Sequence, residues 1–128
     1  GGMGEVYRGE DTLLRRAVAL KVLRRHYGVS AHQFREEARL AARLSHPGIV
    51  PVHDFGELKD GRPFFAMKLV EGQTFEAVLA ANAGPAFVPR AMQYFEQVCQ
   101  AVAYAHDQTP PLLHRDLKPQ NVMIGAYG

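Results

Sequence analysis

The most informative stretch of this chain is HRDLKPQN, at residues 114–121. It places an acid, a cation and an amide, Asp116, Lys118 and Asn121, at fixed offsets between two apolar runs. Moving a phosphoryl group onto a hydroxyl needs these three kinds of group. A carboxylate accepts the hydroxyl proton, a cation offsets charge on the phosphoryl group, and an amide oxygen helps to hold Mg²⁺. The stretch therefore indicates phosphoryl-transfer chemistry.

The same stretch resembles H-R-D-L-x-x-x-N, the catalytic loop of protein kinases. This resemblance implies that Asp116 is the base for the substrate hydroxyl, that Lys118 lies near the γ-phosphate of ATP, and that Asn121 is a ligand of Mg²⁺. A lysine at this place resembles the serine/threonine-directed branch. Arg115 resembles the arginine that pairs with a phosphorylated activation loop. We expect His114 to orient backbone rather than to transfer protons.

The first seven residues, GGMGEVY, match the later part of the kinase pattern G-x-G-x-x-G-x-V. Gly1 would be the second glycine, Gly4 the third and Val6 the valine. Glycine lets backbone N–H groups approach phosphate oxygens in conformations that other residues avoid. Taken alone, such glycines fit a simple hairpin turn equally well. The resemblance implies that these residues cover the nucleotide.

The run Val18–Lys21 resembles the V-A-I-K strand of kinases, in which Lys21 contacts the α- and β-phosphates and Ala19 lines the nucleotide site. Taken alone, a strand lysine would be read as exposed to solvent. In kinases a helix glutamate holds this lysine, and two adjacent candidates exist, Glu36 and Glu37. The local pattern F-x-x-E-A-x resembles bacterial members and favours Glu37, which also borders the apolar stripe of the helix.

Residues 64–72 resemble the last strand of the kinase small lobe as it runs into the hinge between the lobes. Adenine recognition in this family uses backbone N–H and C=O groups of the hinge. The resemblance places Met67 at the back of the pocket and gives Val70 the backbone contact. Most members carry an acid where Lys68 stands, so no role is inferred for that side chain.

Hydrophobic periodicity and turn residues predict a β-rich part with one helix, followed by a helical part. We expect strands at 6–8, 17–23, 49–55, 63–70 and 122–124, and helices at 32–44, 74–81 and from Pro89 to the Pro110-Pro111 stop. Thr74 is expected to cap the second helix. The fold class is therefore α+β, an incomplete protein-kinase-like two-lobe fold. Its parts are a small lobe at 1–66, a hinge at 67–72 and the start of the large lobe at 73–128.

The longest predicted helix carries an apolar stripe at spacings of three and four. Its members are Met92, Phe95, Cys99, Val102 and His106. We expect Cys99 to be a core residue. We also expect the chain to be an internal piece of a larger protein, with the D-F-G aspartate beyond Gly128 and with large-lobe helices that would cover the stripe. The 128 residues alone should then be inactive.

Composition bounds the alternatives. A formal net charge of +2 is too small to favour nucleic acid or an anionic membrane as partner, and no apolar run approaches a membrane span. The single cysteine excludes an internal disulfide and fits a reducing compartment, so we expect a cytoplasmic location. Sensor or membrane domains elsewhere in the parent protein remain open. The histidines show no metal-ligand spacing.

Three functional hypotheses fit these residues. The first is a serine/threonine protein kinase that uses ATP and Mg²⁺ to phosphorylate a protein substrate. The second is a pseudokinase that binds nucleotide or partner proteins without catalysis. The third is a small-molecule kinase of related fold, against which Arg115 and Leu117–Pro119 argue. The ordered series of glycines, lysine strand, glutamate helix, hinge and loop favours the first.

Overall fold

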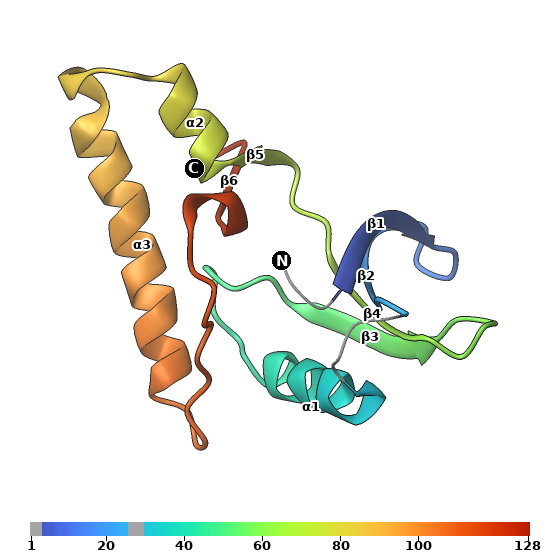
Figure 1. The fold of residues 1–128 in the computed structure, drawn as a ribbon. Helices are drawn as coiled ribbons and strands as arrows, with labels where there is room; N and C mark the ends of the chain where they lie inside the picture. Colours follow the sequence, from blue (N-terminus) through green and yellow to red (C-terminus); the bar gives the residue numbers. More distant parts are fainter. Residues whose placement is uncertain (1–3, 26–29) are drawn as a thin grey trace. The chain divides into compact units, whose positions relative to one another are not determined.

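The computed structural model describes residues 4–25 and 30–128, and the chain divides into two compact units. The first unit holds the residues up to Ser45 together with Val50–Leu69, and the remaining residues form the second. Each unit is built from its own elements (Figure 1). The first is a β-sheet with one helix and the second is mostly helical, which confirms the predicted α+β class.

Four antiparallel strands form the sheet of the first unit, in the order β1-β2-β4-β3. They are β1 (Gly4–Asp11), β2 (Arg16–Leu23), β3 (Val52–Glu57) and β4 (Pro63–Lys68). The hairpin predicted around 6–8 and 17–23 is confirmed, and β1 extends beyond its apolar residues at both ends. β4 ends at Lys68 rather than Val70, because its pairing with β2 ends there, opposite Val18.

The third strand begins at Val52, so the prediction that it begins at Ile49 was wrong. The N–H of Ile49 donates to the carbonyl of His46 at 3.0 Å, and the N–H of Gly48 donates to His46 Nδ1 at 2.9 Å. These bonds place Ile49 in a turn that begins at His46, outside the strand. Pro51 then has no N–H to donate, so regular pairing starts only after it.

Helix α1 (Ala31–Ala42) starts at a capping box that the prediction of 32–44 missed. The N–H of Gln33 donates to Ser30 Oγ, and the N–H of Ser30 donates to Gln33 Oε1, both at 3.1 Å. Reciprocal bonds of this kind satisfy donors that the first helical turn would otherwise leave unpaired. The helix ends before Arg43, its C-cap residue, and is therefore shorter at that end than predicted.

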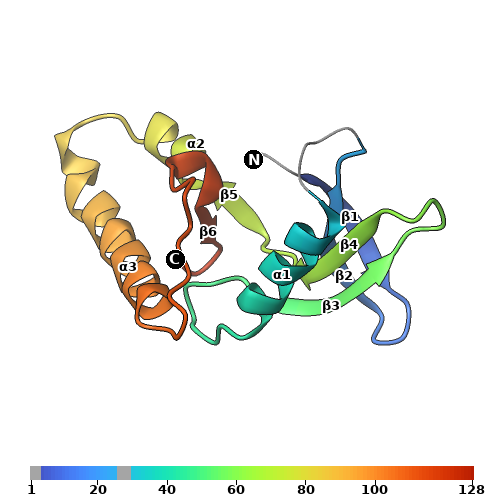
Figure 2. The same cartoon turned by 60° about the horizontal axis from the view of Figure 1, so that its bottom comes forward.

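The core of the first unit lies between α1 and the sheet, and Figures 1 and 2 both show the helix along one face. Phe34 is fully buried and Ala38 is 3% exposed, so these two residues of the helix face the strands. The Phe34 ring packs against Phe65 of β4 with centroids 5.2 Å apart, and Leu23 of β2 completes the cluster. Burying a phenylalanine contributes about 1.5–3 kcal/mol, so this contact fixes the helix on the sheet.

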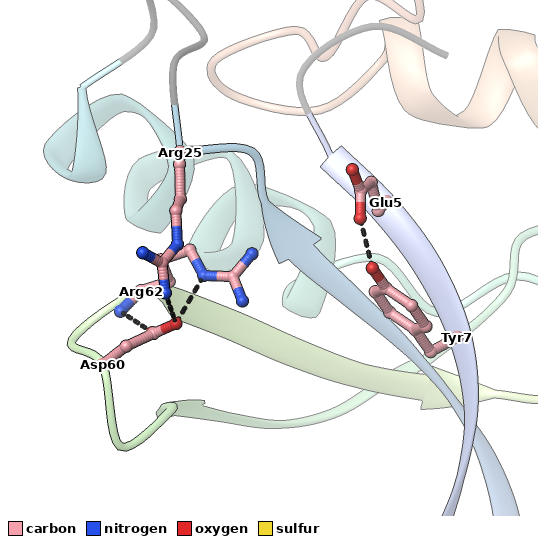
Figure 3. Close-up of polar contacts among 5 residues, drawn as sticks. All are labelled: Glu5, Tyr7, Arg25, Asp60 and Arg62. Carbon is pink, nitrogen blue, oxygen red and sulfur yellow. Dashed lines mark hydrogen bonds and ion pairs between the residues drawn. The ribbon is translucent and has the colours of Figure 1, made fainter.

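Two carboxylates organise exposed side chains in the first unit (Figure 3). Asp60 Oδ2 lies 2.6 Å from Arg25 Nη2 and 3.0 Å from Arg62 Nε, which joins the end of β2 to the β3–β4 turn. The backbone N–H of Arg62, and after it the two guanidiniums, lower the pKa of Asp60 from 3.8 to about 2. The hydroxyl of Tyr7 donates to Glu5, and this hydrogen bond raises the pKa of Tyr7.

We expect the Asp60 cluster to stabilise the first unit only while Asp60 is ionised. Since its folded-state pKa of about 2 lies below the ordinary 3.8, the stabilisation is complete above about pH 4 and is lost as pH falls from 3.8 toward 2. Asp60→Asn should lower the melting temperature of the full-length protein at neutral pH, and the gap to wild type should close in acid. Lys59→Ala, a neighbouring charge change, is the control. A gap for Asp60→Asn that stays constant with pH would contradict this prediction.

The second unit contains a two-stranded sheet and several helices. They are β5 (Gly72–Thr74), α2 (Phe75–Ala81), η1 (Pro85–Phe87), α3 (Val88–His106), η2 (Pro119–Asn121) and β6 (Met123–Gly125). Thr74 caps α2 as predicted, because its Oγ1 accepts the N–H of Ala77 at 3.1 Å, and the helix ends at Ala81. Pro89 lies in the first turn of α3, as its fixed φ angle led us to expect.

The strand predicted at 122–124 is β6, one residue later, and it pairs with β5, which the prediction missed. A Cβ atom on Gly72 would lie 2.0 Å from the carbonyl oxygen of Ile124, so only glycine allows this approach. The N–H of Phe75 donates to the carbonyl of Val122 at 2.7 Å. The loop that ends at β6 is thereby tied to the start of α2.

Helix α3 exposes the stripe that the sequence predicted to be apolar. Met92 is 56% and Phe95 52% exposed, and Cys99 is exposed too. The prediction that Cys99 is a core residue was therefore wrong for this chain, because its side of the helix faces solvent. In the described part of the chain, no helix combines the length and apolar character needed to cross a membrane.

Candidate active site

The predicted lysine and glutamate meet in the first unit. Lys21 Nζ on β2 lies 3.8 Å from Glu37 Oε1 on α1, and the two side chains are 23% and 39% exposed. Glu36 instead pairs with Arg39, whose Nη1 lies 2.6 Å away. Of the two adjacent candidates, Glu37 is thus the one that contacts the lysine. The helix decides this, because the burial of Phe34 turns Glu37 toward β2.

Cross-strand pairing gathers other predicted residues around Lys21. Val6 on β1 lies opposite Lys21, and Ala19 on β2 lies opposite Met67 on β4. Directly opposed residues of antiparallel strands point to the same face, and residues two apart along a strand do so too. Val6, Ala19, Lys21 and Met67 therefore share one face of the sheet.

Gly4 lies at the end of that face, opposite Leu23. A Cβ atom there would lie 2.9 Å from Lys21 Cγ and 3.1 Å from the carbonyl oxygen of Val22. The missing side chain leaves room for the stem of the lysine, so Gly4 helps to place Lys21. Gly1, the other predicted glycine, lies outside the described residues.

Phe65 is a site residue that the sequence reasoning missed. It lies opposite Lys21 in the β2–β4 register, and Lys21 Nζ is 5.7 Å from its ring centroid. A cation over an aromatic face is attracted by the ring. The alternation along β4, which puts Phe65 on the same face as Met67, is the signal that would have found it.

The predicted catalytic loop is held together by Asn121. Its Nδ2 donates to the carbonyl of Asp116 at 2.8 Å and to the Asp116 carboxylate at 3.2 Å. Lys118 Nζ lies 3.6 Å from the other carboxylate oxygen, and its carbonyl accepts the N–H of Asn121 at 2.9 Å. The loop thus brings together all three of its predicted catalytic side chains, with the Asp116 side chain 53% exposed.

The two residues before Asp116 shape the backbone. His114 Nδ1 accepts the N–H of Asp116 at 3.2 Å, which agrees with the expected orienting role of this histidine. Arg115 has a φ of 70°, a left-handed conformation that costs energy for any residue other than glycine. Strained residues of this kind concentrate at functional sites. The backbone turn at Arg115 is therefore a feature of the site.

The oxygen atoms of the loop suit a hard cation. Because Asn121 Nδ2 makes both contacts to Asp116, its Oδ1 is the amide atom that would meet Mg²⁺. Magnesium is usually bound through one or two carboxylates together with substrate phosphates, so it does not need a complete protein cage. Across residues 4–25 and 30–128, no group of three or more histidine, cysteine or acidic side chains comes together for a metal. The residues present fit a Mg²⁺ ion shared with a phosphate ligand.

The predicted residues are divided between the two units. Lys21 and Glu37 lie in the first unit with the glycine and strand residues, whereas the loop at 116–121 lies in the second. One boundary between the units lies between Leu69 and Val70. Met67 therefore belongs to the first unit, with Lys21, and Val70 belongs to the second.

Comparison with known proteins gives a consistent result. The model of the protein kinase domain matches residues 1–128. The chain is 42% identical over 127 residues to serine/threonine-protein kinase PknH of Mycobacterium bovis. It is 40% identical over 131 residues to serine/threonine-protein kinase PrkC of Bacillus subtilis. These alignments cover 97% and 100% of this chain but 21% and 20% of the relatives, so the chain spans about a fifth of their length.

Solved structures agree with this comparison. The kinase domain of PknI from Mycobacterium tuberculosis superposes with a TM-score of 0.78 at 34% identity, covering 99% of this chain and 52% of that one. The apo form of PpkA-294 superposes with a TM-score of 0.77 at 26% identity. The family model, the relatives and the fold agree, and the chain belongs to the protein kinase family.

Proposed function

We propose that the full-length protein is a serine/threonine protein kinase that transfers the γ-phosphoryl group of ATP to a hydroxyl of a protein substrate. The observation that carries the proposal is the loop in which Asn121 and Lys118 contact the Asp116 carboxylate. The names of PknH and PrkC, both serine/threonine-protein kinases, support the same substrate class. Lys118 supports it further, as the residue expected in the serine/threonine branch.

The proposal assigns a lobe to each part of the chain. Residues 1–66 form the small lobe, 67–72 the hinge and 73–128 the start of the large lobe. Gly1, Gly4, Val6 and Ala19 would cover the nucleotide, with Met67 and Val70 at the adenine. Lys21, held by Glu37, would contact the α- and β-phosphates. The 128 residues alone are expected to be inactive.

The chemistry follows from the loop. The substrate hydroxyl oxygen forms a bond to the γ-phosphorus of ATP while the bond between that phosphorus and the β–γ bridging oxygen breaks, and ADP leaves. The hydroxyl proton passes to the Asp116 carboxylate. Asn121 and Lys118 hold one carboxylate oxygen each, which orients the base. The lysine also offsets negative charge on the phosphoryl group. When bound, Mg²⁺ would neutralise phosphate charge, and Asn121 Oδ1 is its proposed ligand in this chain.

The test is a transfer assay with the full-length protein, ATP labelled in the γ-phosphate, and Mg²⁺. A substrate panel should contain casein-like proteins, aminoglycosides and choline. We expect label on serine or threonine of the proteins and none on the small molecules. Label only on a small molecule would favour a small-molecule kinase. Nucleotide binding without any transfer would favour a pseudokinase.

The two adjacent glutamates offer a matched pair of variants. Because Glu37 contacts Lys21 while Glu36 contacts Arg39, we expect Glu37→Gln to lower kcat/KM for ATP at least about tenfold. Glu36→Gln changes the same charge one position away and should leave this ratio near wild type. Steady-state kinetics at varied ATP concentration measure both. Equal losses in the two variants would contradict the assignment of Glu37.

A further inference from the structure

Three of the contacts that the described residues of helix α1 make with the sheet each involve a different strand. Glu37 reaches Lys21 on β2, Phe34 packs on Phe65 of β4, and Arg35 reaches Glu57 on β3, where Arg35 Nη2 lies 2.8 Å from Glu57 Oε1. These strands are neighbours in the order β2-β4-β3. The contacts therefore cross the helix from one side to the other, with the buried ring in the middle.

The helical geometry makes the arrangement nearly symmetric. Successive residues of an α-helix are about 100° apart around its axis. The line midway between buried Phe34 and Ala38 then has Arg35 about 80° to one side and Glu37 about 80° to the other. The two ion pairs therefore restrain the rotation of α1 about its own axis from opposite sides, and loss of either pair leaves the helix freer to turn.

The packing between α1 and β3 leaves empty space on the side of Arg35. A groove of about 240 Å³ lies between α1 and β3, lined by Arg35, Ala38, Arg39 and Ala42 of the helix and by residues 52–55. Empty space there means that side-chain packing alone does not stop the helix from rolling toward β3 or shifting along it. The Arg35–Glu57 ion pair spans the same side and supplies a fixed contact.

We propose that Arg35 and Glu57 are positioning residues, which hold α1 in the rotation that lets Glu37 reach Lys21. This inference rests on the proposed kinase function. The Lys21–Glu37 contact, at 3.8 Å, is long for an ion pair, so a small rotation of the helix would break it. The Arg35–Glu57 pair is shorter and half-exposed, and exposed pairs add little to stability. We therefore expect the Arg35–Glu57 pair to affect the orientation of α1 more than the stability of the unit.

The test uses Arg35→Ala, Glu57→Ala and the charge-exchanged Arg35→Glu/Glu57→Arg in the full-length protein. We expect each single variant to lower kcat/KM for ATP about fivefold while the melting temperature stays near wild type. The charge-exchanged variant should recover most of the loss. In a Glu37→Gln background, Arg35→Ala should not lower kcat/KM any further, because the Arg35–Glu57 pair acts through Glu37. Arg39→Ala, which removes another exposed pair of α1, is the control and should stay at wild-type activity.

Several outcomes would overturn the proposal. Wild-type kcat/KM in both single variants would do so, as would an equal loss of kcat/KM in Arg39→Ala. So would a charge-exchanged variant that recovers no activity, or a loss from Arg35→Ala that adds fully to that of Glu37→Gln. A marked fall in melting temperature without recovery would show a role in stability instead. If wild type transfers no phosphate, the proposed function fails. Hydrogen exchange of the α1 amides then tests whether the Arg35–Glu57 pair positions the helix. Amide exchange should be faster in the single variants and should return to the wild-type rate in the charge-exchanged variant. An unchanged exchange rate in the single variants would overturn the positioning role of the Arg35–Glu57 pair.

Discussion

Asp116→Ala in the full-length protein should lower kcat for phosphoryl transfer about 10³-fold and leave the affinity for ATP nearly unchanged. The reason is that, in the proposed mechanism, Asp116 accepts the proton of the attacking hydroxyl, whereas the proposed ATP contacts come from other residues. Removing the carboxylate also leaves Asn121 Nδ2 with the backbone carbonyl of residue 116 alone. Steady-state kinetics give kcat, and nucleotide titration of the unreacted protein gives the affinity.

Two further variants sharpen this experiment. Asp116→Asn keeps the shape of the side chain and an oxygen that can accept from Asn121, but it cannot take a proton, so it should be nearly as slow as alanine. Asp107→Ala removes an exposed carboxylate just after α3 and should keep wild-type turnover. Full turnover by Asp116→Ala would defeat the assignment of the base. An equal fall in both kcat and ATP affinity would point to a binding role.

Phe34→Ala should destabilise the first unit by about 3–5 kcal/mol. Phe34 is fully buried and its ring contacts Phe65, so truncation removes apolar contacts and leaves a cavity beneath α1. Because the same ring holds the helix that carries Glu37, activity should fall as well. Hydrogen exchange of the β2 and β4 amides in the full-length protein measures the loss of stability in the unit itself.

Leu13→Ala is the matched control for this prediction. Leu13 is 92% exposed in the β1–β2 turn, so its truncation should change the same amide exchange by no more than about 0.5 kcal/mol. An exchange profile of Phe34→Ala that equals that of Leu13→Ala would contradict the packing described for α1. Loss of activity without any loss of protection would separate the two roles of Phe34.

Local patterns in the sequence were sufficient where neighbours along the chain decide the structure. Thr74 caps α2 because its hydroxyl reaches an N–H three residues on, and Pro89 fits the first turn of α3 because its ring fixes one dihedral angle. Asp116, Lys118 and Asn121 meet for the same reason, since only a few residues separate them. The family could be inferred from such short motifs taken in order.

Patterns were insufficient where a partner comes from far along the chain. Apolar residues placed the start of β3 at Ile49, but the turn at His46 takes that residue out of the strand. The helical stripe of α3 predicted burial for Cys99, yet burial depends on what covers the helix. Periodicity identifies the apolar face of an element without identifying what packs on it.

Short-range spacing along the chain was therefore enough to infer the family, most of the helices and strands, and the grouping of Asp116, Lys118 and Asn121 in one loop. The tertiary structure alone decided that Phe65 lies under Lys21 and that Arg35 reaches Glu57. It also turned the preference for Glu37 over Glu36 into a contact. The physical reason is that strand pairing and the packing of Phe34 beneath α1 join residues that lie far apart along the chain and that no local pattern links.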